Sequence, residues 1–435
     1  MKNKITKGFS KLNEAQKRNF AALKCKDPEL SEKIMELFLV KDPSMRKHFL
    51  ELSENTISSF HIPYGLAPNV VVDGKIYHVP MAIEESSVVA AASHSARFWA
   101  VNGGFNVTRV STVKLGHVYF MWYENTGLLL EQWPLLKSFL IERLKKTTAS
   151  MTYRGGGLLN LSLVDCQNEI NRLFKLELEV DTVNSMGANF INTCLEEMAE
   201  IMDIFFNDEE QADNKICQVV ISILSNYTNN CLVTVEAGCL LENFEPIIEK
   251  MPVRLFAEKM VLAYQIAQTD PFRAVTHNKG IMNGIDAVLI ATGNDFRVAE
   301  AAAHAFASKD GQYRGLSWAK LEENTLSFGL TLPLAIGSVG GIINLHPLAK
   351  LSLEILGNPT AKELMGIVAS VGLASNFAAL RSLVTTGIQK GHMKLHLSNI
   401  LNTLNATHDQ RKKAESHFKG KKVSFSAVKH LLDGQ

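Results

Sequence analysis

The stretch that says most about this chain reads Thr276-His277-Asn278-Lys279-Gly280-Ile281-Met282-Asn283-Gly284-Ile285-Asp286. It sets a lysine, an aspartate, a histidine and two asparagines among glycines and small apolar residues, and Asn294-Asp295 follows shortly after. A lysine in such surroundings is expected to be partly buried. Burying a lysine is costly unless it meets a carboxylate, and such pairing is how catalytic lysines are tuned. Lys279 is therefore a candidate catalytic residue, with a structural ion pair as the alternative.

Length and composition indicate a multidomain globular protein. The chain has 435 residues, which predicts two or three domains. Its 45 basic and 44 acidic residues give a net charge of +1, which offers no support for a nucleic-acid or membrane-surface partner. The six cysteines form no CxxC pair and show no zinc-ligand spacing, which favours a reducing compartment. Without an apolar signal segment or a run of about 18 apolar residues, we predict a cytoplasmic protein with no membrane span.

Hydrophobic periodicity predicts separate blocks of helices and strands. Asp73-Gly74 lies between apolar runs and predicts a hairpin. Helices are expected over 88–101, 128–146, 255–268, 297–307, 348–356 and 360–374. Strands are expected over 107–121 and near 158–165 and 175–181, and residues 217–240 are expected to be rich in β-structure. Lys279 falls in an expected loop, with a buried strand expected at 287–291. The pattern favours an α+β fold with a mixed or antiparallel sheet.

Several residues could carry chemistry, and each has a simpler structural explanation. The chain has neither a GxGxxG fingerprint nor a Walker loop. The segment 184–189 can present backbone N–H groups to phosphate at a helix start, or its glycine can serve packing alone. Glu85 and Asp295 suit helix N-termini. His392 and His396 share a helix face, but no third ligand is suggested, so no metal is expected.

In combination, these residues resemble a known family, the 3-hydroxy-3-methylglutaryl-coenzyme A (HMG-CoA) reductases of the soluble, bacterial second class. The Thr-His-Asn-Lys-Gly form of the lysine motif resembles that class specifically. Matching stretches run from about residue 54 to 396. They include Glu54-Asn55-Thr56-Ile57, Val79 to Ala91, Asn102-Gly103-Gly104-Phe105, Ser185 to Asn189, Ser225-Asn226, Asp270 to Arg273, Thr276 to Asp286, Ala291 to Asp295, Val339-Gly340-Gly341, His346-Pro347 and Gly391-His392-Met393.

The resemblance implies an α+β architecture in four segments. A large helical and β substrate-binding domain is expected over 1–110 and 221–376. A small ferredoxin-like domain that binds the nicotinamide cofactor is expected to be inserted at 111–220, and a helical C-terminal flap at 377–435.

The resemblance also implies a two-step, four-electron reduction of HMG-CoA through mevaldehyde to mevalonate and free coenzyme A, with two NAD(P)H. Lys279 matches the lysine that stabilises the oxyanion. Glu85 matches the acid that protonates the aldehyde, a role that requires burial. Asp295 matches the carboxylate that links these two residues. His392, on the flap, matches the donor that protonates the departing thiolate.

The binding residues follow from the same resemblance. Ser87 and Arg273 match residues that hold the free carboxylate of the substrate. Asn226 and Asn283 match residues of the same pocket. The family forms its active site between subunits, so a homodimer or higher oligomer is expected, with Glu54-Asn55 in the dimer contact.

The cofactor site is where the chain departs from the family. Met186, Gly187 and Asn189 match the cofactor-binding segment, but the usual Asp-Ala before Met-Gly is Asn184-Ser185. NADH-specific members place an acid before the glycine triplet, which is Gly155-Gly156-Gly157 in this chain. The position of that acid corresponds here to Thr148, near Lys145 and Lys146. Because a carboxylate would repel a 2′-phosphate, its absence favours NADP(H) over NAD(H).

Further departures are Ile57-Ser58 in place of Ile-Gly, and Ser375 in place of a glutamine. Two alternatives stay open. One is the same enzyme working in the catabolic direction, with mevalonate oxidised by NAD and coenzyme A. The other is a non-catalytic, coenzyme A-binding paralogue.

Overall fold

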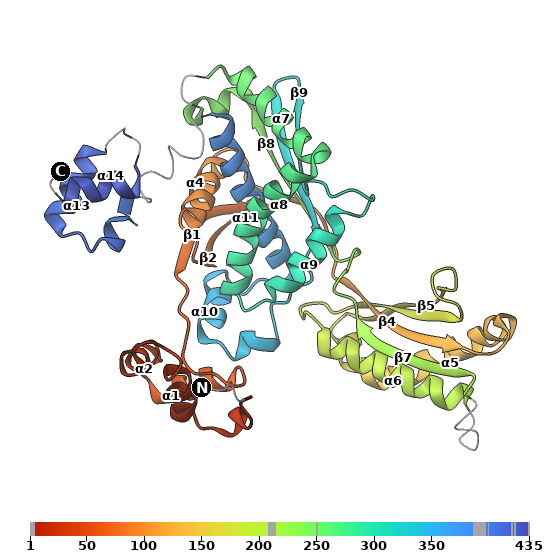
Figure 1. Cartoon of the computed structure of the whole chain (residues 1–435). Helices are drawn as coiled ribbons and strands as arrows, with labels where there is room; N and C mark the ends of the chain where they lie inside the picture. Colours follow the sequence, from red (N-terminus) through yellow and green to blue (C-terminus); the bar gives the residue numbers. More distant parts are fainter. Residues whose placement is uncertain are drawn as a thin grey trace. The chain divides into compact units, whose positions relative to one another are not determined.

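A computed structural model describes residues 5–207, 215–248, 251–385, 397–398, 400–418, 421 and 423–433. The chain divides into two compact units, Met1–Pro63 and Tyr64–Gln435 (Figure 1). The first unit is helical, and the second contains both helices and strands. The chain therefore has the α+β composition that the sequence predicted.

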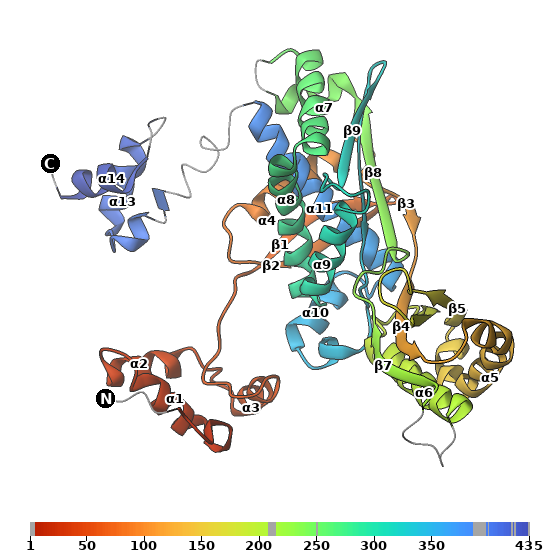
Figure 2. The same ribbon diagram turned by 45° about the vertical axis from the view of Figure 1, so that its right-hand side comes forward.

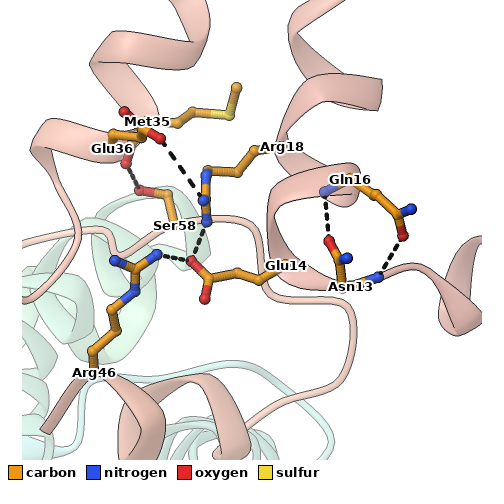
Figure 3. A network of polar contacts seen from close by, with 8 residues as sticks. All are labelled: Asn13, Glu14, Gln16, Arg18, Met35, Glu36, Arg46 and Ser58. Atoms are coloured by element: carbon orange, nitrogen blue, oxygen red, sulfur yellow. Dashed lines mark hydrogen bonds and ion pairs between the residues drawn. The ribbon is translucent and has the colours of Figure 1, made fainter. Parts of the chain in front are cut away.

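The N-terminal unit consists of short helices, each started by a capping side chain. Its elements are η1 (Phe9–Lys11), α1 (Glu14–Ala22), α2 (Pro28–Leu37) and α3 (Pro43–Glu51). Asn13 and Gln16 form a capping box at α1. Figure 3 shows the ion network that holds these helices, in which Glu14 accepts from both Arg18 and Arg46. Polar contacts of this kind matter here because, in the described part of the unit, Ala22 and Leu39 alone among the hydrophobic residues are fully buried.

The second unit opens with the predicted hairpin. Strands β1 (Tyr64–Val72) and β2 (Lys75–Ala82) pair antiparallel around Asp73-Gly74. Both turn residues have positive φ, 48° and 77°, as a type I′ turn requires. Helix α4 (Val88–Ala100) follows β2 directly, so the link 83–87 joins a strand end to a helix start.

A second sheet contributes to the main hydrophobic core. Its strands are β3 (Asn106–Val110), β8 (Leu232–Leu240), β10 (Thr325–Pro333) and β9 (Ser317–Glu322), all paired antiparallel in that order. Figure 2 shows α8 and α11 on one side of this sheet. The remaining elements of this region are η3 (Leu241–Ile247), α7 (Val253–Thr269), α8 (Pro271–Ala291), α9 (Phe296–Ala307), η4 (Gly341–Asn344), α10 (Pro347–Ile355) and α11 (Ala361–Val384). Trp99, Phe328 and Phe377 pack together at the centre of this core.

The third sheet has its own helices and its own core. Strands β4 (Val113–Trp122), β5 (Gly157–Asp165), β6 (Leu173–Asp181) and β7 (Cys217–Leu224) form an antiparallel sheet in the order β5-β6-β4-β7. Helices α5 (Thr126–Tyr153) and α6 (Ala188–Phe206) cover one face (Figure 1). The β-α-β-β-α-β succession with this strand order is ferredoxin-like. These elements run from Val113 to Leu224, and the insertion was predicted at 111–220.

Some sequence expectations were wrong, above all around Lys279. The expected loop and the expected strand 287–291 are one continuous helix, α8. Gly284 serves the packing of this helix, because a Cβ there would lie 2.8 Å from the Val371 carbonyl of α11. The single strand expected over 107–121 is two strands, β3 and β4, in different sheets.

Helix α11 is longer than predicted and contains the expected boundary between residues 376 and 377. By length and composition it could cross a membrane, which the sequence analysis did not anticipate, but 72% of its most apolar window is buried inside the protein. A core helix passes the same test. In the C-terminal region, α13 (His408–His417) and α14 (Phe425–Leu432) share a small apolar cluster of their own.

Candidate active site

Lys279 and Glu85 form an ion pair across the second unit. Lys279 Nζ donates to Glu85 Oε2 at 2.5 Å. Lys279 projects from the exposed face of α8, while Glu85 lies in the link between β2 and α4. Their side chains are 59% and 45% exposed. The chain by itself therefore supplies the expected pairing but not the expected burial.

The link that carries Glu85 has an unusual backbone. Ser87, the N-cap of α4, has a φ of 77°, in the left-handed region that non-glycine residues rarely adopt. Such conformations persist where the surrounding structure fixes them, and they concentrate at functional sites. Ser87 thus has the distinctive geometry that its predicted substrate-binding role would suit.

Helix α8 presents Arg273, Asn283 and Lys279 within about a third of its circumference, at 100° per residue. Arg273 is half-buried in the first turn, and burial lowers its pKa. Among the described residues, no carboxylate pairs with its guanidinium. An arginine in this state is available to bind a carboxylate from outside the chain.

His277, from the same motif, belongs to the core. Its Nε2 lies 2.6 Å from Ser317 Oγ, which donates to Asn376 Oδ1 at 3.1 Å. Burial lowers the pKa of His277 to about 3, so the ring is neutral. This network ties α8 to β9 and α11 and fixes the rotation of the helix that carries Lys279.

Asp295 is the N-cap of α9, as its sequence context predicted, and accepts from Arg297 N at 3.0 Å. Its carboxylate also accepts from Arg297 Nε at 3.0 Å and from a terminal guanidinium nitrogen at 2.9 Å. These hydrogen bonds lower the pKa of Asp295. The structure brings Asp295 into hydrogen-bonding contact with neither Lys279 nor Glu85, within the residues that it describes.

A pair of neighbouring carboxyl groups is formed by α8 and α9. Asp286, two helical turns after Lys279, is close enough to Glu300 of α9 for the two groups to affect each other's pKa. Glu300 in turn pairs with His304, whose Nδ1 lies 2.7 Å from Tyr313 Oη. Burial, together with Glu300, raises the pKa of Asp286 to about 8. Near neutral pH, Asp286 is therefore protonated and can donate to Glu300.

A cavity of about 570 Å³ next to Asp295 is lined by the N-terminal ends of α6 and α9. Ser185, Met186, Gly187 and Asn189 form one wall. The other lining residues are Met151, Arg154, Ala188, Phe190, Gly293 to Arg297, Gly337 and Val339 to Ile343. Three predicted cofactor residues, Met186, Gly187 and Asn189, are thus brought together.

Asn184 ties this cavity to the main core. Its side-chain Oδ1 accepts from Ala361 N, in the first turn of α11, at 2.9 Å. Its carbonyl accepts from Ser338 N at 2.9 Å. The asparagine that stands in place of the family's usual aspartate therefore accepts a hydrogen bond from the first turn of α11 and carries no charge.

Two predicted site residues lie elsewhere, and a third is not among the described residues. Thr148 is buried in α5, where its hydroxyl donates to the Leu144 carbonyl at 2.9 Å, and it is absent from the cavity lining. Asn226 lines a separate small cavity with Lys114 and Met186. His392 lies outside the described residues.

Two arginines of the cavity at α6 and α9 were not predicted from the sequence. Arg154 immediately precedes the glycine triplet, and Arg297 follows Asp295 by two residues. A basic residue next to each motif was the available signal. Lys145 and Lys146 were the basic residues expected near the cofactor, whereas Met151 of α5 and Arg154, the residue that caps the end of α5, line the cavity.

Comparison with known proteins decides the family. The family model for hydroxymethylglutaryl-coenzyme A reductase matches residues 16–397. The chain belongs to this family. It is 37% identical over 384 residues to the 3-hydroxy-3-methylglutaryl-coenzyme A reductase of Archaeoglobus fulgidus, covering 87% of this chain and 84% of that protein. It is therefore an oxidoreductase.

Solved structures of HMG-CoA reductases agree. A class II HMG-CoA reductase from Streptococcus pneumoniae, bound to NADPH in open conformations, superposes with a TM-score of 0.72 at 38% identity, covering 88% of this chain and 100% of that one. Another structure of the reductase from S. pneumoniae has a TM-score of 0.72 at 36% identity, covering 99% of this chain and 100% of the other. The predicted family and α+β fold are confirmed.

Proposed function

We propose that this protein reduces HMG-CoA to mevalonate and free coenzyme A, through mevaldehyde, with two equivalents of a reduced nicotinamide. The observation that carries the proposal is the hydrogen-bonded Lys279–Glu85 pair on the exposed face of α8. It joins a cation that can stabilise an oxyanion to a carboxyl group that can move a proton. The half-buried Arg273 on the same helix supports binding of the far carboxylate of the substrate.

The residues of the chain would act in sequence. A bound nicotinamide supplies hydride in each reduction. The Lys279 ammonium stabilises the negative charge that develops on the thioester oxygen, and His392 protonates the departing coenzyme A thiolate. Glu85 then protonates the aldehyde oxygen. Ser87, Arg273, Asn283 and Asn226 hold the substrate, and Asp295 would act as the carboxylate that links Lys279 and Glu85.

The cavity at α6 and α9 suits a dinucleotide carrying several phosphates. Gly187 caps α6 with a φ of 84°, and a Cβ there would collide with Thr182. Glycine at this position therefore lets the backbone pack closely on Thr182. The first residues of α6 line the cavity, and helix N-terminal amides can donate to a phosphate. Arg154 and Arg297 add positive charge to the same lining, and Asn184 leaves out the family's usual negative one. We therefore assign the site to NADP(H) in preference to NAD(H), with residues 111–220 as the cofactor domain.

The exposure of Lys279 and Glu85 supports a homodimer in which a second copy of the chain covers each site. Covering the pair would also provide the burial that proton donation by Glu85 requires. Glu54-Asn55 lies in the expected contact. The proposal includes a cytoplasmic location and biosynthetic direction.

The decisive experiment is a spectrophotometric assay of the purified protein at 340 nm. The forward assay would measure the rate at which NADPH or NADH is oxidised when HMG-CoA is added. The reverse assay would measure the rate at which NADP or NAD is reduced when mevalonate and coenzyme A are added. Faster HMG-CoA reduction with NADPH is expected. Faster mevalonate oxidation with NAD would favour the catabolic direction, and absence of turnover in both directions would favour a coenzyme A-binding paralogue.

A further inference from the structure

Lys114 is a buried cation without a carboxylate bonded to it among the described residues. It is the second residue of β4 and is 2% exposed. Its Nζ donates to Thr182 Oγ1 at 2.6 Å and lies 3.4 Å from the carbonyl oxygens of Thr112 and Ser185. The nearby Asp181 carboxylate accepts from Thr112 Oγ1 instead, at 2.8 Å. Burial of an ammonium group with neutral partners is costly, so its placement calls for a functional reason.

The partners of Lys114 control the turn before α6. Thr182 Oγ1 accepts from Lys114 and donates to the Ser185 carbonyl at 2.7 Å, which makes a relay of two hydrogen bonds. The Thr182 methyl group packs where a Cβ of Gly187 would be. Between them, Val183 has a φ of 51°, which is strained for a β-branched residue. The hydrogen bond from Lys114 thus stabilises a strained turn. Without that hydrogen bond, the backbone of the turn would move to a less strained conformation.

This turn forms a wall of the cavity assigned above to the cofactor. Ser185, Met186 and Gly187 line that cavity. Met186 and Ala188 also line the small cavity next to Lys114. The ammonium group therefore lies behind the wall, where it can act on the cofactor only through the turn and through its electric field.

We propose that Lys114 is a positioning residue for the nicotinamide cofactor. Through Thr182 it holds the 182–187 turn so that the N-terminal amides of α6 face the cofactor phosphates. Its buried positive charge adds to the affinity of the site for these phosphates. This inference rests on the proposed function, because it takes the α6 cavity as the cofactor site.

The test compares Lys114→Met and Thr182→Val in the full-length protein. Both side chains keep their approximate size and lose the relay. The Kd for NADPH, measured by nicotinamide fluorescence without HMG-CoA, and the KM for NADPH should each rise about tenfold, as expected for loss of a hydrogen bond to a charged group. Because the two hydrogen bonds act in series and Lys114→Met also removes the charge, the double variant should bind little worse than Lys114→Met alone. The KM for HMG-CoA should stay within about twofold of wild type.

Lys175→Met is the matched control. Lys175 lies in β6 of the same domain and pairs with Glu177 at 2.9 Å, away from the turn. It should leave the Kd for NADPH unchanged. A second readout is pH, because burial lowers the pKa of Lys114, on which Cys231 and Asp181 also act. The alkaline loss of NADPH affinity in the wild type should be weaker in Lys114→Met.

The outcomes separate the two proposals. A wild-type protein that binds NADPH without reducing HMG-CoA contradicts the proposed function and leaves the Lys114 binding test intact. Wild-type NADPH affinity in both variants overturns the positioning role, as does an equal rise in the KM values for NADPH and HMG-CoA. If Lys114→Met does not fold, as judged by circular dichroism, Thr182→Val decides by the same criteria.

Discussion

Lys279 and Glu85 are 194 residues apart in the chain, yet their side chains are hydrogen-bonded at 2.5 Å. Lys279 depends on the rotation of α8, and Glu85 depends on the short link between β2 and α4. The distance between the two side chains therefore depends on how two separate elements pack. A small shift of either element should lower the rate of the reaction more than it lowers the free energy of unfolding.

Replacing the acid of this pair should stop the chemistry and spare substrate binding. Glu85→Gln keeps a hydrogen-bonding side chain but cannot give up a proton, so kcat for HMG-CoA reduction should fall by about 10²–10⁴-fold. Calorimetry should show nearly unchanged HMG-CoA affinity. Glu84→Gln, at the adjacent exposed position, is the control and should retain wild-type kcat. Near-normal turnover by Glu85→Gln would remove Glu85 from the proposed role.

His392→Ala should separate the two half-reactions. Only the first releases a thiolate, so reduction of HMG-CoA should lose more activity than reduction of supplied mevaldehyde, by about 10²-fold or more. Parallel stopped-flow assays of both substrates would measure the ratio. His396→Ala, four residues away in sequence, serves as the comparison. Equal losses in both half-reactions would contradict protonation of the thiolate by His392.

Removing Arg154 should weaken discrimination between the two nicotinamides. If its guanidinium binds the 2′-phosphate, Arg154→Ala should raise the KM for NADPH about tenfold or more and change the KM for NADH little. Arg143→Ala is a control on the same helix, because Arg143 stacks over Phe139 at 5.0 Å. The ratio of kcat/KM values for NADPH and NADH measures the effect. An unchanged ratio would assign the preference to other residues.

Asp286 should make the protein less stable as pH rises toward 8. Its pKa is raised to about 8 in the folded protein, from 3.8 ordinarily, by burial and by Glu300. The unfolded chain thus loses this proton first, and its contribution to stability declines between about pH 4 and 8. Asp286→Asn mimics the protonated form and should be more stable than wild type at pH 8. Urea unfolding at pH 5 and 8 would test this, with the exposed Asp310→Asn as control.

Two glycines of α8 offer a matched comparison. Gly284→Ala would push a methyl group against the Val371 carbonyl and Ser375, which should lower the free energy of unfolding by about 1–3 kcal/mol. Gly280→Ala meets no atom within 4 Å and should instead raise it by about 0.5–1 kcal/mol, through helix propensity. Urea titration of both variants distinguishes these signs. Similar effects at both positions would contradict the close packing of α8 on α11.

Local signals predicted much of the fold. Asp73-Gly74 specified its own turn, and Asp295 specified its helix start, because both depend on neighbouring residues alone. The strand prediction for residues 287–291 was wrong because this part of α8 is buried over most of its surface. Such a helix has a continuous apolar run, which sequence alone does not distinguish from a buried strand. The packing role of Gly284 could not be predicted either, since its partner helix α11 is far away in sequence.

Less of the candidate site than of the fold could be predicted from sequence patterns. Glu85 and Lys279 could be joined only through the family resemblance, because no local rule links residues so far apart. Thr148 and Arg154 are six residues apart on one helix, and only the structure shows which of them faces the cavity. The engagement of Asp295 by Arg297 was likewise invisible, although the two are close in sequence.

The hydrogen bond that Asn184 accepts from Ala361 gives α11 a mechanical meaning. The helix has 24 residues, so it is a rod about 36 Å long. Its first turn is hydrogen-bonded to Asn184, next to residues that line the 570 Å³ cavity, and 72% of its most apolar window is buried. A helix packed in this way moves as one rigid body, because a close-packed interior transmits strain. A displacement of Asn184 would therefore be carried along α11 as far as Val384.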